Sequence, residues 1–395
     1  MFKKTNKKTR VPKSRCKLRL VYFIPLLLFL SILVFGAAEK AIPEKVSAVS
    51  ENVMGVSSEI SAQDEYTAKL FGILPSKNVK GDTAQKRELT PCGDVFGVKF
   101  FTKGVVVTEI SEVEGDEGII SPASKAGLKK GDVIISINGK EVNTSEETTK
   151  IIHDSRGDPL SVCFLRDGKK YRAKVIPVKA ANDSTYKAGM WVRDSTAGIG
   201  TVTYYDPEDG SFAGLGHGIY DSETQLLLPL LRGAVVDITL DDIIKGRNGH
   251  PGELKGIFGT EKIGSLVSNT PCGVYGVLAK EPALLYEKMP CAARDEIQKG
   301  SASILSNVDG KGVCEYSVEI IKIYSGNEET KNFVIEVTDE TLLEKTGGIV
   351  RGMSGSPIIQ NGKLVGAVTH VLVNDPTRGY GIFIENMLAE AERIK

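Results

Sequence analysis

The sequence predicts a mainly β protein with two folded domains behind one N-terminal membrane-spanning helix. Short β-branched runs separated by glycine-rich turns dominate from residue 191 onward, a pattern typical of a β-barrel or sandwich. Residues 135–142 predict a strand that ends in a hairpin turn at Asn138-Gly139. Residues 20–38 carry no charge, and nineteen residues of helix approach the hydrocarbon thickness of a bilayer.

Charge is distributed unevenly along the chain. Residues 1–19 contain nine Lys or Arg and no acid, which leaves 41 basic against 50 acidic residues in the rest. An acidic folded part argues against nucleic-acid binding, because phosphate neutralisation requires basic surface. The basic segment is expected to stay in the cytoplasm, with everything after residue 38 exported. A cleaved signal peptide is the alternative, but the apolar run is longer than a signal-peptide core and favours a lasting anchor.

Residues 39–93 are rich in Ser, Glu, Lys and Ala with weak periodicity, which predicts a stalk. The cysteines show neither CxxC nor His–Cys spacing, so we interpret them as buried structural residues. They are Cys16, Cys92, Cys163, Cys272, Cys291 and Cys314. No metal or small-molecule cofactor is expected.

A small α+β domain is predicted over residues 94–180. The run SPASKAGLKKGDVIISINGKEV, residues 121–142, resembles a PDZ domain of the kind attached to bacterial envelope proteases. Such domains add an extended peptide to a sheet edge beside a loop of free backbone N–H groups. The resemblance assigns that loop to Phe96, Gly97, Val98, Lys99 and Phe100. An acidic insertion at residues 112–117 departs from the usual pattern.

The run GMSGSP at residues 352–357 is the main chemical signal. A serine hydroxyl becomes a nucleophile only when a base takes its proton and N–H donors receive the oxyanion. Gly-x-Ser-Gly supplies such a turn, so Ser354 is the candidate nucleophile and the N–H groups of Gly352 and Ser354 the candidate oxyanion hole. A structural Gly–Ser turn is the alternative, and Ser356 is a local rival that Pro357 disfavours.

Residues 356–370 resemble the hairpin and substrate-binding strand that follow the nucleophile in chymotrypsin-like peptidases. This resemblance implies a double β-barrel serine peptidase domain over residues 185–395. It places Thr369, His370 and Gly348 at the substrate. Gly347-Gly348 lies where a charged residue would be needed to select Arg or Lys, so no trypsin-like preference is expected.

Only four histidines are available as the base. His217 lies between glycines after a hairpin and precedes Ser354 by 137 residues, far enough to belong to a separate barrel. His370 follows the serine, His250 lies in a turn and His153 belongs to the PDZ-like region. His217 is therefore the preferred base, with a structural histidine as the alternative.

The orienting carboxylate is less clear from pattern. Asp237, Asp241 and Asp242 lie between His217 and the second barrel, as chymotrypsin-like order requires. Asp339 lies only fifteen residues before Ser354. Pattern alone favours the first group.

A narrower resemblance comes from GLGHGIYD (214–221), VTDETLLEKTGGIVRGMSGSPIIQNGKLVGAVTH (337–370) and NDPTRGYGIFIENML (374–388). Together with the PDZ-like segment and the N-terminal apolar run, they resemble the stage IV sporulation protein B (SpoIVB) peptidase family of spore-forming Firmicutes. The resemblance implies a catalytic triad of His217, Asp339 and Ser354, and so moves Asp339 to first place.

The same resemblance implies a sporulation signalling role. The enzyme would lie on the forespore membrane facing the intermembrane space, cleave itself in trans, and cut the inhibitory partner of an intramembrane metalloprotease, leading to sigma factor maturation. One alternative is an HtrA-like quality-control protease, although there the protease precedes the PDZ domain. Another is a non-enzymatic PDZ scaffold with a degenerate protease domain.

Overall fold

The computed structural model describes residues 45–46, 56–60, 65–70, 74–81 and 87–394, apart from 117, 283 and 327. The predicted cytoplasmic segment and membrane anchor, residues 1–38, lie outside the described residues. Among the residues that are described, no helix is long and apolar enough to cross a bilayer. The chain divides into two compact units, Met1–Thr83 and Ala84–Lys395.

The first unit contains a small sheet within the predicted stalk. Its described strands are β1 (Lys45–Val46), β2 (Val56–Ile60), β3 (Glu65–Leu70) and β4 (Leu74–Gly81), in the order β1-β4-β3-β2. The prediction of a stalk over residues 39–93 does not anticipate this sheet. The sequence of β4 (LPSKNVKG) lacks the apolar alternation that predicts a half-buried strand.

The PDZ domain begins the second unit. Its elements are β7 (Val113–Gly115), β8 (Gly118–Ile120), α2 (Pro122–Lys125), β9 (Val133–Ile137), β10 (Lys140–Glu141), α3 (Ser145–Asp154), β11 (Leu160–Arg166), β12 (Lys169–Val175), β13 (Val178–Lys179) and β14 (Tyr186–Lys187). The predicted turn joins β9 to β10, with positive φ at Asn138 and Gly139 (51° and 79°). Thr144 caps α3 by accepting a hydrogen bond from Glu147 N at 3.1 Å.

A first barrel follows from pairing of long strands. Its described strands pair in the ring β6-β17-β18-β19-β16-β15, which closes where β15 pairs with β6. They are β6 (Val95–Ile110), β15 (Met190–Asp206), β16 (Ser211–Gly214), β17 (Leu230–Ile244), β18 (Glu253–Thr270) and β19 (Gly273–Leu278), with β5 (Glu88–Pro91) and β20 (Met289–Pro290) beside β15. Phe96, Phe100 and Phe212 are buried in the core of this barrel.

The second barrel is closed by the order β21-β22-β23-β26-β25-β24. Its strands are β21 (Gly300–Ser306), β22 (Cys314–Ile323), β23 (Phe333–Val337), β24 (Pro357–Gln360), β25 (Lys363–Leu372) and β26 (Asp375–Phe383), preceded by the 3₁₀ turn η2 (Arg294–Glu296). Helix α4 (Glu340–Thr346) follows β23, and helix α5 (Ile384–Ile394) follows β26. The described part of the chain is thus mainly β, with a PDZ domain and two β-barrels.

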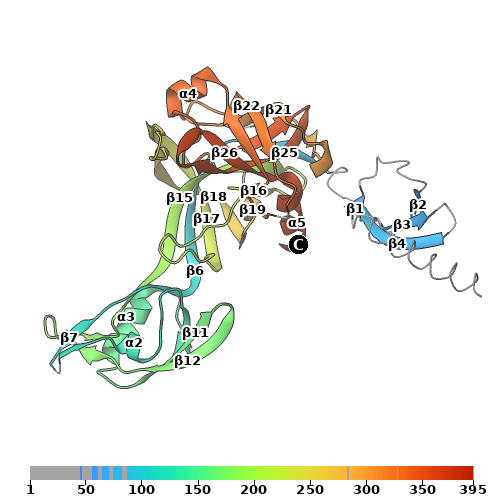
Figure 1. Ribbon diagram of the computed structural model, residues 1–395. Helices are drawn as coiled ribbons and strands as arrows, with labels where there is room; N and C mark the ends of the chain where they lie inside the picture. Colours follow the sequence, from blue (N-terminus) through green and yellow to red (C-terminus); the bar gives the residue numbers. More distant parts are fainter. Residues whose placement is uncertain are drawn as a thin grey trace, which may run out of the picture. The chain divides into compact units, whose positions relative to one another are not determined.

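Strands β6 and β15 belong to both the PDZ domain and the first barrel (Figure 1). Residues of β6 between Val106 and Ile110 pair with the start of β15, and residues between Val95 and Phe101 pair with its middle. β17 pairs with the other edge of β6 from Gly97 to Thr102.

This pairing corrects the expected peptide-binding loop. Phe96–Phe100 form a strand, and all but the first of these residues have β15 on one side and β17 on the other. Their backbone N–H groups are therefore used by the sheet and are not free for a peptide. The buried side chains of Phe96 and Phe100 hold the strand in the barrel core. The domain boundary expected near residue 94 falls instead within β6.

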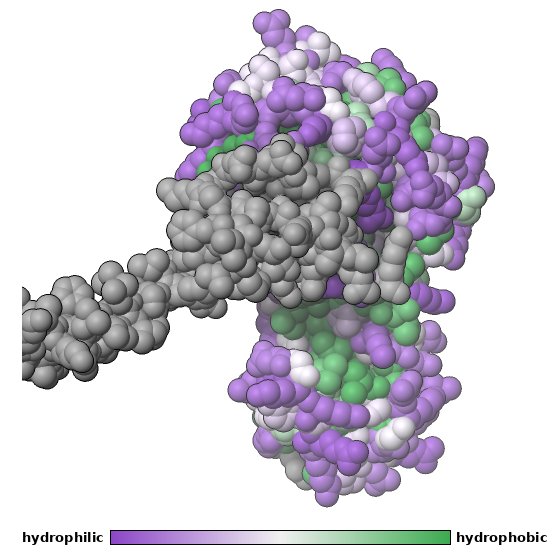
Figure 2. Space-filling view, turned by 90° about the vertical axis from the view of Figure 1, so that its right-hand side faces the viewer, coloured by the Kyte–Doolittle hydropathy of each residue, from purple (hydrophilic) through white to green (hydrophobic). Residues whose placement is uncertain are grey.

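Some hydrophobic side chains of this unit are exposed. On the face shown in Figure 2, hydrophobic residues gather on the part of the molecule just below the barrels. Exposed large apolar side chains of the second unit include Trp191 on β15, at 64% exposure, and Leu231 on β17, at 45%.

Candidate active site

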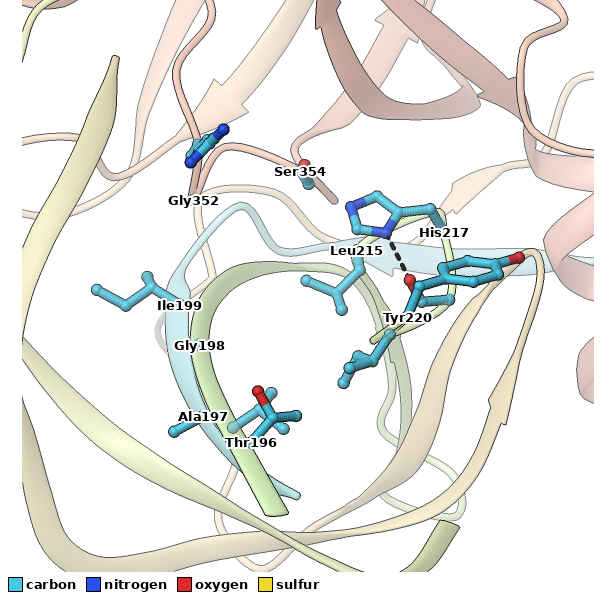
Figure 3. A pocket seen from close by; sticks show the side chains of 13 residues that line it. Thr196, Ala197, Gly198, Ile199, Leu215, His217, Tyr220, Gly352 and Ser354 are labelled. Carbon is cyan, nitrogen blue, oxygen red and sulfur yellow. Dashed lines mark hydrogen bonds between the residues drawn. The ribbon is translucent and has the colours of Figure 1, made fainter. Parts of the chain in front are cut away.

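A pocket of about 270 Å³ lies where residues of the first barrel meet the turn before β24. Its walls combine two predicted catalytic residues with the middle of β15 and the loop after β16 (Figure 3). The lining residues are Val98, Thr196, Ala197, Gly198, Ile199, Leu215, His217, Gly218, Ile219, Tyr220, Arg351, Gly352 and Ser354. Val98, expected in the PDZ loop, thus lies here instead.

The turn that carries Ser354 is tied to both barrels. The Ser354 carbonyl oxygen accepts from Thr201 N at 2.9 Å, and Gly355 N donates to Val368 O at 2.7 Å. Gly355 has φ of +101°, and a Cβ there would lie 2.0 Å from Thr201 O, so only glycine lets the turn approach β15. Within the described part of the chain, the N–H groups of Gly352 and Ser354 have no acceptor. They remain available to an oxyanion.

The two serines of the motif have different environments. Ser354 is partly exposed in the pocket, and its Oγ donates to Thr369 O at 2.7 Å. Ser356 is fully buried, and its Oγ contacts Ser306 Oγ at 3.2 Å. A substrate in the pocket can therefore reach Ser354 but not Ser356.

His217 lies beside Ser354 on the loop after β16 (Figure 3). Its Nδ1 is 2.8 Å from Gly218 O, and the second ring nitrogen lies on the side of Ser354. Because a carbonyl oxygen can only accept, Nδ1 carries the proton in the neutral ring and Nε2 is a free base. Burial lowers the pKa of His217 and outweighs the Gly218 hydrogen bond, which acts in the opposite direction. The imidazole is therefore neutral at pH 7, as a general base must be.

His370 packs against this imidazole. The two ring centroids are 4.8 Å apart with an interplanar angle of 36°. Burial first, and then the neighbouring His217 and Lys331, lower the pKa of His370 to about 4. His370 is thus a neutral neighbour of His217 at physiological pH.

The structure does not bring Asp339 to His217. Asp339 is the N-cap of α4, where Oδ1 accepts from Leu342 N at 2.9 Å and Oδ2 from Ser317 N at 3.4 Å. The acceptor at His217 Nδ1 is instead a backbone carbonyl. The helix cap uses one carboxylate oxygen and Ser317 N contacts the other, so this arrangement does not support an orienting role for Asp339.

The aspartates that pattern favoured do not contact the His217 imidazole either. Asp237, Asp241 and Asp242 are exposed on β17. The residue that does contact the loop after His217 is Asn269, near the end of β18, which sequence pattern did not single out. No local motif marks an asparagine near a strand end as part of a site.

The residues expected at the substrate do not line the pocket. Thr369 is buried, and its Oγ1 donates to Thr330 O and Tyr380 O. Gly348 is buried against Pro376, where a Cβ would lie 2.2 Å from a carbonyl oxygen. Of the three, His370 alone keeps solvent-exposed surface, although its ring packs against His217.

Comparison with known proteins identifies the family. A family model described as SpoIVB peptidase S55 matches residues 184–388, just over half of the chain. The chain belongs to the SpoIVB peptidase family. A PDZ domain model matches residues 85–176. As a SpoIVB-family member the protein is a serine peptidase, which confirms the activity predicted from the Ser354 motif.

Individual relatives of this SpoIVB-family chain match shorter stretches. The serine protease Do-like HtrA of Bacillus subtilis is 40% identical over 75 residues, 18% of this chain and 15% of the relative. The zinc metalloprotease RasP of Oceanobacillus iheyensis is 31% identical over 88 residues, 22% of this chain and 20% of the relative. The chain thus matches at most a fifth of either relative's length. Among solved structures, the active form of the Rv3671c protease from M. tuberculosis is 16% identical with a TM-score of 0.29, covering 51% of this chain and 75% of that one.

Proposed function

We propose that this SpoIVB-family peptidase is a sporulation signalling endopeptidase that is anchored in the membrane and works outside the cytoplasm. The observation that carries the catalytic part of the proposal is the shared pocket of His217 and Ser354. Ser354 is the nucleophile, His217 the general base, and the N–H groups of Gly352 and Ser354 the oxyanion donors.

The chemistry follows from these roles. His217 Nε2 takes the proton of Ser354 Oγ as the oxygen attacks the peptide carbonyl carbon. The two N–H groups stabilise the oxyanion, and the imidazolium then protonates the leaving amine. Water hydrolyses the acyl-enzyme by the same route. The Ser354 hydroxyl must first break its hydrogen bond to Thr369 O, which requires rotation about one side-chain bond.

Membership of the SpoIVB peptidase family supports the biological role. We propose that the enzyme lies on the forespore membrane facing the intermembrane space, through residues 20–38, and cleaves itself in trans. Its regulatory substrate would be the inhibitory partner of an intramembrane metalloprotease. Cleavage of that partner would activate the metalloprotease and lead to sigma factor maturation. The nine cations of residues 1–19 favour the orientation that exports the peptidase domain.

A fluorophosphonate probe and a Ser354→Ala variant test the catalytic proposal. Wild type should be labelled, whereas Ser354→Ala should take no label and lose roughly 10⁴- to 10⁶-fold in turnover. Unlabelled, folded wild type would favour the scaffold alternative.

Sporulating cells that produce either wild type or the Ser354→Ala variant test the signalling proposal. Wild type should yield a few discrete cleavages, of itself and of one membrane protein, that cells with Ser354→Ala lack. Broad degradation of unfolded proteins by the purified enzyme would favour a quality-control protease instead.

A further inference from the structure

The peptide group between Gly218 and Ile219 supplies the hydrogen-bond partner of His217 Nδ1, the ring nitrogen that a triad carboxylate contacts in serine peptidases. Its carbonyl oxygen, from Gly218, is the acceptor 2.8 Å from His217 Nδ1. Its N–H, from Ile219, donates to Asn269 Oδ1 at 2.8 Å. One planar unit therefore joins the Asn269 side chain to the imidazole.

Asn269 holds this peptide group in one orientation. Its Nδ2 donates to Ile219 O at 3.0 Å and to Leu228 O at 2.9 Å, at the two ends of the loop after His217. One N–H donor and two carbonyl acceptors surround the amide, so its oxygen and nitrogen are assigned without ambiguity. The side chain uses its acceptor and both donors on this loop.

Neighbouring contacts keep the peptide from rotating. Gly218 N donates to Pro271 O at 3.0 Å, on the turn that follows Asn269. A Cβ at Gly218 would lie 2.6 Å from Thr270 O and 2.4 Å from Leu227, so the loop can approach β18 only with glycine there. The carbonyl of Gly218 is thus fixed toward the imidazole from both sides.

We propose that Asn269 is a positioning residue that acts through the Gly218–Ile219 peptide to hold His217 as the Nδ1–H tautomer, the role a carboxylate has in other serine peptidases. This inference rests on the proposed roles of His217 and Ser354. A hydrogen bond to the peptide N–H polarises the carbonyl at its other end, which strengthens the acceptor for Nδ1–H. The free Nε2 lone pair then faces the Ser354 hydroxyl.

The difference from a carboxylate lies in charge. A peptide carbonyl carries a dipole rather than a full negative charge, so it stabilises the imidazolium less than an aspartate does. Around the imidazole the other titratable or charged side chains are His370, Tyr220 and Arg351. Of the described residues, none donates or accepts a hydrogen bond at His217 other than Gly218.

Three variants and one spectroscopic measurement test the proposal. Asn269→Leu removes all three hydrogen bonds at similar volume, and Asn269→Asp keeps the acceptor for Ile219 N–H. Asn307→Leu is the matched control, because Asn307 is itself buried and also uses its amide oxygen and nitrogen in hydrogen bonds, with Gly310 N and Asp94 Oδ1, in another part of the fold. We expect Asn269→Leu to lower kcat about 10- to 100-fold with KM unchanged, since Asn269 does not line the pocket.

We expect Asn269→Asp to retain more kcat than the leucine variant and the Asn307 control to retain it nearly fully. An equal loss in the Asn307 control, or full kcat in folded Asn269→Leu, would overturn the proposal.

The ring ¹⁵N chemical shifts of His217 supply a readout that a purely structural role would not move. Four histidines are present, and a His217→Gln variant assigns the signal. Wild type above pH 7 should show a protonated Nδ1 and a bare Nε2, and Asn269→Leu a mixture of both tautomers. A wild type with protonated Nε2 contradicts the proposal even if no Asn269 variant folds.

Fluorophosphonate labelling separates this test from the proposed function. Labelled wild type with unlabelled Ser354→Ala supports the site whatever the Asn269 variants do.

Discussion

The Ser354 hydroxyl donates to the carbonyl oxygen of Thr369 at 2.7 Å rather than to a ring nitrogen of His217. The nucleophile Ser354 and the base His217 therefore line one pocket without a hydrogen bond between them. Apo structures of peptidases commonly have long or misaligned catalytic hydrogen bonds that tighten when substrate binds. Here the competing acceptor belongs to β25, the strand expected to bind substrate.

The buried serine of the motif should be dispensable for catalysis. Ser356→Ala removes only a contact to Ser306, so turnover should stay near wild type while the free energy of unfolding falls by about 1 kcal/mol. Peptide hydrolysis and urea denaturation measure the two effects. A loss of turnover as large as that of Ser354→Ala would contradict the assignment of Ser354.

Substitution of Asp339 separates a helix cap from a triad member. Asparagine caps helices about as well as aspartate, so Asp339→Asn should keep the bond from Leu342 N, lose only the longer contact from Ser317 N, and retain most of the stability and of kcat. Asp339→Ala should lower the free energy of unfolding by about 1 kcal/mol. A triad aspartate would instead cost roughly 10⁴-fold in kcat on change to asparagine, because the histidine takes the wrong tautomer. Parallel kinetics and denaturation of both variants decide between the roles.

Activity should persist to lower pH than an unperturbed histidine allows. The pKa of His217 lies below the ordinary 6.5, and only the neutral ring is a base, so the acid limb of kcat/KM should have its midpoint below pH 6.5. Below pH 6.5 the unfolded chain binds a proton at this histidine, whereas the native ring stays neutral until its lowered pKa. The free energy of unfolding therefore falls as the pH drops from 6.5 toward that pKa. A rate profile with its midpoint at 6.5 or above would refute the prediction.

The residue on the acyl side of the scissile bond should be small or apolar. Ile349 is 2% exposed and packs against Gly379, where a Cβ would lie 2.5 Å from its Cδ1. Gly347 and Gly348, just before it, carry no side chain where a specificity carboxylate would be needed, so a substrate cation would have no charged partner from these positions. Peptides that differ only at this position should be cut faster with Ala, Val or Leu. Faster cleavage after Arg or Lys would exclude this arrangement.

Arg193 should contribute to stability from outside the pocket. It pairs with Asp221, whose side chain is fully buried in the loop after His217, and its Nη2 lies 2.9 Å from Glu223 Oε1. Arg193→Met leaves the Asp221 carboxylate without its charged partner and should lower the free energy of unfolding by about 1.5–3 kcal/mol. Arg232→Met, which removes only a stacking contact on Phe101, is the control and should change it much less.

Local patterns were sufficient for some of these features. The turn at Asn138-Gly139 needs positive φ, which those residues tolerate, and it lies where predicted. The turn of Ser354 likewise requires glycine at 355, so its motif predicts its shape. Both features depend on a few neighbouring residues.

Features that depend on distant partners were not predictable in this way. A run such as Phe96–Phe100 forms a strand equally well in a PDZ sheet or in a barrel, and only pairing with β15 and β17 decides. Asn269 acquires its role from a loop fifty residues earlier in the sequence. The carboxylate of Asp339 satisfies the local helix end, a demand that its spacing from Ser354 does not reveal.

The sharing of β6 and β15 limits how such a protein can evolve or be engineered. A domain joined by a linker can be excised, duplicated or transplanted as a cassette. Here deletion of residues 94–180 removes β6 and opens the barrel that carries His217. The PDZ domain and the peptidase must therefore be inherited together, and chimaeras should exchange both or neither.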